Sequence, residues 1–507
     1  MIPHLSSRPA RLVARRARID TYQAPVVYLR KDCAVCRAEG FEAQSSIELS
    51  HGGHQVVATV HQVEASWLAP GEAALSEAAW LQLGVTEGAD LDVRHAPVLE
   101  SMRHVRGKIF DVPLDEPKLR LIMQDVVAHR LSDLQLTAFL TTCAGDRMSL
   151  QETIALTRAM VGVGQRLHWD RAPVMDKHCV GGLPGNRTTL VVVPIVAACG
   201  LLMPKTSSRA ITSPAGSADT METLAPVNLD LTTLRRVVER EGGCIAWGGS
   251  AHLSPADDIL IRVERPLELD GIAQLVASVL SKKAAVGSQQ VLIDIPVGPT
   301  AKVRSTVAAS ALGHTLTQVG EALGLQLRVL QTDGHQPVGR GIGPALEAWD
   351  VMGVLQCQPD AAPDLRERSL RLAGELLEMG GRAGPGEGGA LARQTLDSGL
   401  AWTKFQAICE AQGGLRTPPR APCQQEVLAT DAGCVAFIDN RRLATAAKLA
   451  GAPQAPAAGL VLHVRLGERV AKGQPLFTLH AQTPGELAYA AVYVADHPGL
   501  VAVGDYR

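Results

Sequence analysis

The stretch that decides the fold reads DKHCVGGLPGNRTT, residues 176–189, and it runs directly into an apolar segment that begins at Leu190. A glycine-rich loop that opens a helix presents free backbone N–H groups, and the helix dipole adds positive potential at the same place. The stretch therefore predicts an anion site, to which Lys177 adds a charge and Thr188 and Thr189 add hydroxyl groups. A plain strand–turn–helix connection is the alternative, and the Gly-Lys-Ser/Thr ending of a Walker loop is missing.

A second polar stretch, KTSSRAITSPAGSADTME, occupies residues 205–222. Its serine and threonine hydroxyls, together with Arg209, can surround a phosphate through neutral and charge-assisted hydrogen bonds. A solvated serine-rich loop is the alternative interpretation. The apolar segment between the two stretches, residues 188–204, contains Pro194 and Gly200, and we interpret it as a buried helix rather than a membrane span.

Length and composition describe an ordinary globular protein with several domains. A chain of 507 residues is too long for one core, so two to four domains are expected. Its formal net charge of -2 argues against a dedicated nucleic-acid-binding protein, which would usually be strongly basic. Aromatic residues make up only 3% of the chain, so platforms for stacking bases of a single strand are not expected either.

The cysteines and the first residues bear on the cellular location. The ten cysteines are scattered and there is no apolar signal region, which favours a reducing cytoplasm. The arginine-rich residues 8–18 are interpreted as an irregular arm, with a transit peptide as the alternative. Cys33 and Cys36 form one CxxC pair without a second pair at ligand spacing, so ordinary cysteines are favoured over a zinc or redox site, and no metal is expected.

The order of patterns along the chain predicts a small barrel, a helical region and an α/β region. Residues 1–97 carry β-like segments, a helix-like stretch and a closing strand, which suggests a barrel. Residues 98–165 are helical, and the α/β pattern begins near residue 172. The expected elements are strands at 26–30 and 55–61, helices at 74–83 and 149–159 (opened by a Ser149–Glu152 capping box), a helix at 271–285, a strand at 291–296, a helix at 301–323, a strand at 325–330, a flexible loop at 380–390 and a strand-rich tail at 424–507.

The two polar stretches resemble the thymidine/pyrimidine-nucleoside phosphorylase family. Asp176-Lys177-His178 with Gly181-Gly182 is similar to the family's phosphate loop. Ser207-Ser208-Arg209-Ala210 and Gly216-Ser217-Ala218-Asp219 with Glu222 are similar to its second signature. The resemblance covers residues 98–507. The residues of segments 181–189 and 208–216 are most similar to a longer branch of the family, which contains AMP phosphorylases and type 2 thymidine phosphorylases. Members of this branch carry an extra N-terminal domain, which corresponds to residues 1–97.

The resemblance implies roles for particular residues. On the phosphate side it implies Lys177, Cys179, Gly182, Thr189, Ser207 and Ser217. The family usually has Ser where Cys179 stands and Thr where Ser217 stands. On the nucleoside side it implies Asp270 as proton donor with His178 as the second catalytic residue, and Ser208, Arg209, Thr212, Ser213, Ser278, Lys282 and Lys302 as substrate-binding residues.

From the residues alone, purely structural roles stay open for the residues assigned to the nucleoside base. Asp270 would be a helix cap, Lys282 and Lys283 a solvated face, and His178 a loop histidine. Burial would have to raise the pKa of Asp270 before it could act as an acid near neutral pH. The arginine that contacts the base in the shorter family members has no clear counterpart, because Arg262 lies out of register.

The implied architecture is an α/β multidomain protein. Its expected domains are an N-terminal barrel-like domain (1–97), a discontinuous helical domain (98–165 with 255–288), an α/β phosphate-binding domain (166–254 with 289–423) and a C-terminal hammerhead-like part (424–507). Phosphate would bind on the α/β side and the base on the helical side, so catalysis would require domain closure. A homodimer or larger homo-oligomer is also implied, with no cofactor, no nucleic-acid partner and no membrane.

The implied activity is phosphorolysis of thymidine or another pyrimidine nucleoside, with inorganic phosphate as co-substrate. The alternative is a nucleoside 5′-monophosphate phosphorylase, such as an AMP phosphorylase that gives ribose 1,5-bisphosphate. That reaction would need a second phosphate site, for which Arg209, Thr212 and Ser213 are candidates. A protein that keeps the fold without the activity is a third hypothesis, against which the intact Lys177 and His178 argue.

Overall fold

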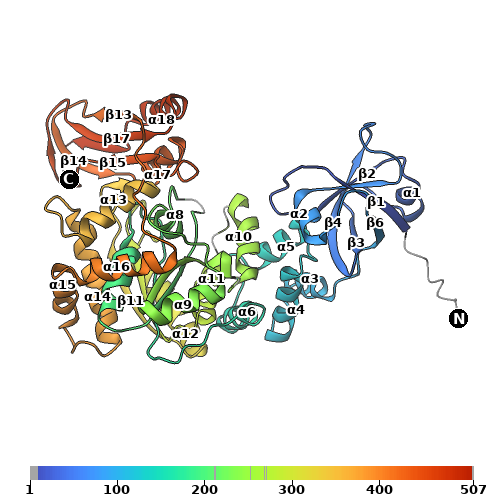
Figure 1. Cartoon of the computed structure of the whole chain (residues 1–507), viewed down its shortest axis with the longest axis horizontal. Coiled ribbons are helices and arrows are strands. Elements are labelled where there is room, and N and C mark those ends of the chain that lie inside the picture. The colour runs from blue at the N-terminus through green and yellow to red at the C-terminus, as the bar shows by residue number, and fades with distance from the viewer. Residues whose placement is uncertain (1–9, 211–212, 252, 268, 270, 505–507) are drawn as a thin grey trace. The chain divides into compact units, whose positions relative to one another are not determined.

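The computed structural model describes residues 10–504, apart from 211–212, 252, 268 and 270. The chain divides into two compact units. The first contains residues 1–163 with 255–274, and the second contains residues 164–254 with 275–507. Each unit is described by itself below (Figure 1). No helix among the described residues is long and apolar enough to span a membrane.

A closed six-stranded barrel begins the first unit and confirms the barrel expected from the sequence. Its strand order is β1-β5-β2-β4-β3-β6. The strands are β1 (Ala10–Arg16), β2 (Val26–Arg30), β3 (Ser46–His51), β4 (His54–Val63), β5 (Glu72–Leu75) and β6 (Asp90–His95), with the short helices α1 (Ala34–Glu39) and α2 (Glu77–Leu83) between them. Alternate side chains such as Ile47, Leu49, Leu91 and Val93 fill the barrel.

One boundary expected in the barrel is wrong. We expected a helix at residues 74–83, but the structure places Glu72–Leu75 in β5 and begins α2 at Glu77. Ser76 separates the two elements because its side chain caps the helix by accepting a hydrogen bond from Ala79 N. Ala73, Ala74 and Leu75 are small or apolar residues that fit either element, and their pairing with neighbouring strands decides for β5.

Helices complete the first unit. They are α3 (Glu100–Ile109), α4 (Glu116–Val127), α5 (Asp133–Cys143), α6 (Leu150–Gly162) and α10 (Pro255–Leu267). The predicted capping box of α6 is confirmed, since Ser149 accepts from Glu152 N and Glu152 accepts from Ser149 N. Glu152 also accepts a hydrogen bond from the buried Lys108 ammonium at 2.6 Å. The cap residue therefore also joins α6 to α3.

Parallel strands form the centre of the second unit. Strands β7 (Met175–Cys179), β10 (Gln290–Val297) and β11 (Gln326–Asp333) pair in the order β11-β10-β7, and β8 (Met203–Ser207) pairs with β9 (Gly243–Trp247). A parallel bridge between Val174 and Leu202 connects the two groups. The carboxyl ends of β7 and β8 therefore lie at the same edge, where parallel α/β sheets usually place ligands.

Helix α7 (Thr188–Ala198) is buried on all sides, among α14 (Pro363–Met379), α15 (Gly388–Asp397) and α16 (Leu400–Gln412). The apolar pattern predicts a helix that continues to residue 204. This prediction is wrong beyond Ala198, because the chain turns at Gly200 and then forms β8. An apolar run fits a buried helix and a buried strand equally well, and pairing with β9 decides for the strand.

Two further boundaries differ from expectation. The helix expected at 301–323 begins only at Thr306, because Val303 bridges to Val297 and Ser305 caps α12 (Thr306–Ala322). The loop expected at 380–390 ends where α15 begins at Gly388. The remaining helices of this part are α8 (Ser217–Glu222), α9 (Leu231–Glu241), α11 (Ile272–Ala285) and α13 (Pro344–Leu355).

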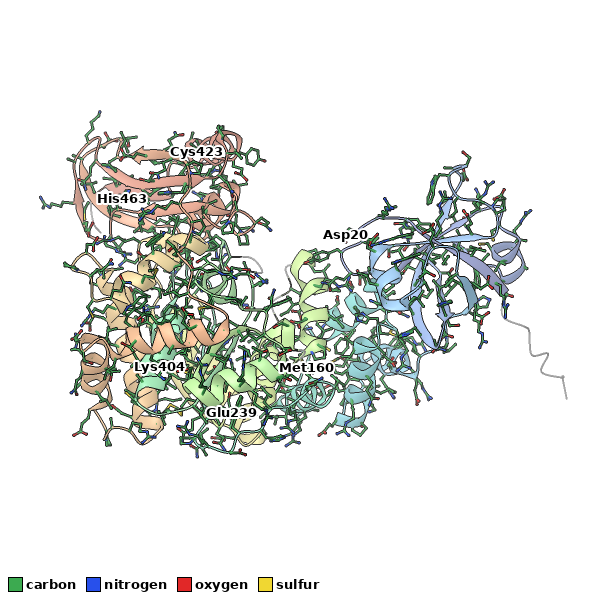
Figure 2. The ribbon with its side chains drawn as sticks, viewed as in Figure 1. Asp20, Met160, Glu239, Lys404, Cys423 and His463 are labelled. Atoms are coloured by element: carbon green, nitrogen blue, oxygen red, sulfur yellow. The ribbon has the colours of Figure 1, made fainter. Side chains whose placement is uncertain are left out.

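The C-terminal part is strand-rich, as expected. One sheet has the order β12-β15-β17-β13 and a second has the order β16-β14-β18. Their elements are β12 (Gly341–Ile342), β13 (Cys423–Leu428), β14 (Gly433–Ile438), β15 (Gly459–Leu462), β16 (Arg469–Val470), β17 (Pro475–Ala481) and β18 (Val501–Gly504), with helices α17 (Asn440–Leu449) and α18 (Pro484–Asp496). His463, labelled in Figure 2, directly follows β15. Its Nε2 lies 2.7 Å from the Thr478 hydroxyl on the neighbouring strand β17.

Candidate active site

A buried lysine marks the start of the glycine-rich loop. Lys177 lies on β7 with only 1% of its surface exposed, and its ammonium donates to Thr188 Oγ1 at 2.5 Å. Burial lowers the pKa of Lys177 from its usual value. Among the described residues no carboxylate lies within ion-pair distance of this ammonium, although it has three N–H donors. The more distant Asp294 charge on β10 opposes this lowering of the pKa, and an incoming anion would add a direct partner for the ammonium.

The loop after β7 is shaped around the start of α7. Gly182 has φ of +77°, and a Cβ there would overlap the backbone N of Lys302, so only glycine fits. The loop ends at Thr188 and Thr189, the first residues of α7. Free N–H groups at this helix start, together with its dipole, favour an anion beside Lys177.

Cys179 shares the Lys177 face of β7. Its thiol accepts a hydrogen bond from Asn186 Nδ2 at 3.2 Å, and Asn186 also lies 3.5 Å from the Asp294 carboxylate on β10. Burial and the nearby Asp294 raise the pKa of Cys179 to about 12. The thiol is therefore neutral at physiological pH and is a weak hydrogen-bond donor. Asp294 itself accepts from Thr332 Oγ1 at 2.6 Å.

The opposite face of β7 carries a buried charge cluster. The Asp176 carboxylate lies 2.8 Å from Lys283 Nζ and 3.6 Å from Lys205 Nζ, and all three side chains are almost fully buried. Burial and the neighbouring Lys283 lower the pKa of Lys205 to about 7. Our interpretation of Lys283 as part of a solvated face is wrong, because Lys283 is only 2% exposed. Sequence reasoning also missed Lys205, although it ends the apolar run with a single charge.

His178 follows Asp176 on this face, beside the lysines. Burial lowers its pKa well below 6.5, and the positive charges of Lys283, Lys205, Lys282 and Lys177 lower it further. His178 is therefore a neutral imidazole at physiological pH, with one donor and one acceptor nitrogen. Such a group can donate a hydrogen bond to an oxygen or nitrogen that gains negative charge.

The serine-rich stretch leaves β8 at Ser207 and returns into α8 at Ser217. The Asp219 carboxylate accepts from Ala210 N at 2.6 Å and from Gly216 N at 2.8 Å, which joins the two ends of the loop. Gly216 must be glycine, because a Cβ there would lie 2.5 Å from Ser208 O. Ser213 donates to Ala215 O at 2.9 Å. Thr212, expected to bind substrate, lies outside the described residues.

Arg209 is already paired within this loop. Its guanidinium donates to both Glu222 carboxylate oxygens at 2.5 and 2.9 Å, and to Asp219 at 3.3 Å. The guanidinium also lies 4.9 Å from the centre of the Trp247 ring. The hydrogen bond from Arg209 lowers the pKa of Glu222. A second phosphate at Arg209 would therefore compete with two carboxylates.

The other expected substrate residues lie on separate elements. Ser278 and Lys282 are one turn apart on α11, with 3.5 Å between Lys282 Nζ and Ser278 Oγ. Lys302 is an exposed residue whose backbone approaches Gly182 closely. Asp270, the expected proton donor, lies outside the described residues. The structure thus places Lys177 and Cys179 on the strand before the glycine-rich loop and Thr189 on the helix after it, and it brings Lys282 near His178.

Family models match three segments of the chain. They are described as the α/β domain of a glycosyl transferase family (residues 171–402), the helical bundle domain of such a family (104–164) and a pyrimidine nucleoside phosphorylase C-terminal domain (434–497). A protein of Acidovorax sp. (strain JS42), named "Putative thymidine phosphorylase 1", is 63% identical over 98% of this chain and 97% of its own length. The chain belongs to the thymidine/pyrimidine-nucleoside phosphorylase family.

This membership makes the chain a pentosyltransferase of the nucleoside phosphorylase type. The similarity extends over nearly the whole length of its relatives. A protein of Polaromonas sp. (strain JS666 / ATCC BAA-500) is 62% identical over 99% of this chain and 98% of its own, and one of Hahella chejuensis (strain KCTC 2396) is 56% identical over 97% of both. Both are named "Putative thymidine phosphorylase".

A solved structure shares the fold at low identity. The anthranilate phosphoribosyltransferase of Thermus thermophilus aligns with a TM-score of 0.51 and 20% identity, covering 61% of this chain and 98% of its own. This nucleoside phosphorylase chain is therefore longer than the shared fold. The likeness concerns the fold alone and says nothing of the substrate.

Proposed function

We propose that the chain catalyses the reversible phosphorolysis of thymidine, or of a related pyrimidine nucleoside, to the free base and 2-deoxy-α-D-ribose 1-phosphate. The observation that carries the proposal is the buried Lys177 ammonium in the middle of β7, whose hydrogen-bond partner among the described residues is a hydroxyl. The names of the full-length relatives support the choice of thymidine. Phosphate would complete the charge balance at Lys177 and act as the nucleophile.

In this mechanism phosphate is held by charge and by hydrogen bonds. Lys177 would supply the charge and the backbone at Gly182 would supply N–H donors. Thr189, Ser207 and Ser217 would supply hydroxyl donors from the starts of α7 and α8 and the end of β8. Holding phosphate next to C1′ replaces a bimolecular encounter by a positioned one, which supplies much of the rate acceleration.

The reaction then exchanges one bond at C1′ for another. A phosphate oxygen forms a bond to C1′ as the glycosidic C–N bond breaks, and the sugar passes through an oxocarbenium-like state. The electron pair of the C–N bond leaves with the base. Lys282 and the neutral imidazole of His178 would stabilise the developing negative charge. We assign the role of proton donor to Asp270 on the resemblance alone. Ser278 would help to hold the base.

The alternative is a nucleoside 5′-monophosphate phosphorylase, for example an AMP phosphorylase that releases ribose 1,5-bisphosphate. Its second phosphate would bind at the start of the serine-rich loop, where Ser208 directly follows β8 and is exposed. Ser213, Thr212 and Arg209 would complete such a site. The pairing of Arg209 with Glu222 and Asp219 argues against a free 5′-phosphate clamp.

Base release from six substrates distinguishes the two activities. Purified protein is incubated with inorganic phosphate and, in turn, thymidine, uridine, deoxyuridine, AMP, CMP or UMP, and the free base is measured by liquid chromatography. Phosphate-dependent release from unphosphorylated pyrimidine nucleosides is expected. Release only from the monophosphates would replace the proposed activity by the alternative and would assign Arg209 to the 5′-phosphate.

A further inference from the structure

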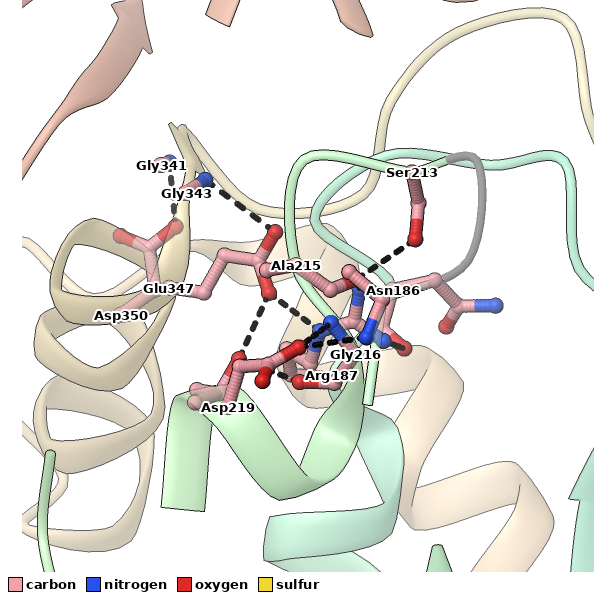
Figure 3. A network of polar contacts seen from close by, with 12 residues as sticks. Asn186, Arg187, Ser213, Ala215, Gly216, Asp219, Gly341, Gly343, Glu347 and Asp350 are labelled. Carbon is pink, nitrogen blue, oxygen red and sulfur yellow. Dashed lines mark hydrogen bonds and ion pairs between the residues drawn. The ribbon is translucent and has the colours of Figure 1, made fainter. Parts of the chain in front are cut away.

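Arg187 connects the glycine-rich loop to the serine-rich loop through a buried network (Figure 3). It is the residue before α7, and its guanidinium Nη2 donates to Ala215 O at 2.6 Å. Its Nε donates to the Glu347 carboxylate on α13. The Arg187 side chain is 12% exposed and the Glu347 side chain is not exposed. One side chain thus holds together two backbone segments that are 28 residues apart in sequence.

Other groups also hold Glu347. Besides Arg187, the Thr220 hydroxyl donates to Glu347 Oε2 at 3.0 Å and Gly343 N donates to Oε1 at 3.3 Å. Burial raises the pKa of Glu347, and these partners lessen the rise. Thr220 Oγ1 also lies 3.2 Å from Gly216 O. A fixed carboxylate fixes the guanidinium, since the rigid planar fork of arginine binds the carboxylate and the Ala215 carbonyl at the same time.

The positions of the two loops make this network relevant to the site. Arg187 lies two residues before Thr189, and Ala215 lies two residues before Ser217. Thr189 and Ser217 come from different segments, and both are assigned to phosphate under the proposed function. The contact between Arg187 and Ala215 O sets the spacing of the backbone segments that carry these two hydroxyls.

We propose that Arg187 is a positioning residue that holds the serine-rich loop against the glycine-rich loop, so that phosphate meets the hydroxyls of both, and that Glu347 orients it. This inference rests on the proposed function. A misplacement of about 1 Å at a positioned site costs on the order of 100-fold in rate. Loss of the Arg187 contact is therefore expected to weaken phosphate binding without an equal effect on the nucleoside.

Four variants test the role of Arg187. Arg187→Met removes the link, and Thr220→Val weakens it from the other side of Glu347. Lys177→Met removes the proposed phosphate charge. Arg393→Met is the matched control, because Arg393 on α15 binds both carboxylate oxygens of Glu367 on α14, at 2.9 and 3.0 Å, and neither helix belongs to the two loops. Equilibrium dialysis with radiolabelled inorganic phosphate gives the Kd, steady-state kinetics give both KM values, and circular dichroism checks folding.

For Arg187→Met the expected result is a phosphate Kd and KM about 10- to 100-fold higher, with the nucleoside KM within about twofold of wild type. Thr220→Val is expected to shift phosphate binding in the same direction by a few-fold, and Arg393→Met not at all. If Arg187→Met does not fold, Thr220→Val decides: an unchanged phosphate Kd in that variant overturns the inference.

The outcomes also separate this inference from the proposed function. Wild-type phosphate affinity in Arg187→Met, with affinity lost in Lys177→Met, overturns the role of Arg187 alone. Wild-type affinity in both variants overturns the phosphate site itself. Equal increases in the KM of phosphate and nucleoside would assign Arg187 to general stability and would also overturn the inference.

Discussion

On one face of β7 a buried ammonium meets only a hydroxyl among the described residues, whereas on the other face two buried ammonium groups meet a carboxylate. Lys177 donates to Thr188, and Lys283 and Lys205 surround Asp176. Burying a charge without a directly bonded counter-charge costs stability, and removing one partner of a buried ion pair is strongly destabilising because it leaves the other charge uncompensated. We therefore expect the Lys177 face to bind an anion, whereas the Asp176 face already pairs its charges with one another.

The strongest test of this contrast is Lys177→Met. If phosphate supplies the missing counter-charge, kcat/KM for phosphate should fall about 1000-fold, as when a charged group of a preorganised site is removed. The free energy of unfolding without phosphate should not fall and is expected to rise, because a poorly compensated buried charge is gone. Phosphorolysis assays and thermal unfolding measure the two quantities, and Arg393→Met serves as control. Unchanged turnover would contradict the assignment of the phosphate site to the Lys177 face.

Lys283→Met should change stability in the opposite direction to Lys177→Met. The Asp176 carboxylate would keep the more distant Lys205 as its cation, beside hydrogen bonds from Lys177 N and Ser288 Oγ, so the free energy of unfolding is expected to fall by about 3 kcal/mol, the scale for breaking a buried ion pair. Thermal unfolding of the two purified variants, Lys283→Met and Lys177→Met, measures this difference as a difference between their midpoints. Equal changes in the two variants would show that both faces of β7 bury charge in the same way.

An effect that is smaller for each pH unit is expected from Lys205, whose pKa is lowered from 10.5 to about 7. Between these values the unfolded chain binds more protons at this position than the folded chain does, so stability should rise with pH above about 7 and level off near 10.5. The contribution is at most about 1.4 kcal/mol per pH unit. Thermal midpoints at pH values of about 7, 8 and 9 for wild type and Lys205→Met measure it within this window. Parallel pH curves for the two proteins would contradict the lowered pKa.

The smallest effect is expected at Cys179. A serine hydroxyl donates better hydrogen bonds than a neutral thiol, so Cys179→Ser should lower the phosphate KM by about threefold, or about 0.6 kcal/mol. The nucleoside KM should not change. Steady-state kinetics at saturating nucleoside give the value. A higher phosphate KM in the variant would contradict a donor role for this side chain.

Local patterns determined much of what the sequence predicts. The capping box at Ser149, the strand at Val26–Arg30 and the glycine-rich loop before α7 depend on neighbouring residues, and the structure has them where the sequence placed them. The family resemblance comes from the same kind of short segment. The roles of individual site residues stay predictions, and those of Asp270 and Thr212 fall outside the described residues.

Only the tertiary structure decided which charges are buried together and which loops are tied to each other. Lys283 stands far along the chain from Asp176, and Glu347 stands 160 residues after Arg187. A charged residue on a helix is usually solvated, so the sequence alone assigns Lys283 to a surface. Pairing of β7 with β10 and the packing of α11 and α13 bring these partners within hydrogen-bonding distance, and no local pattern encodes that proximity.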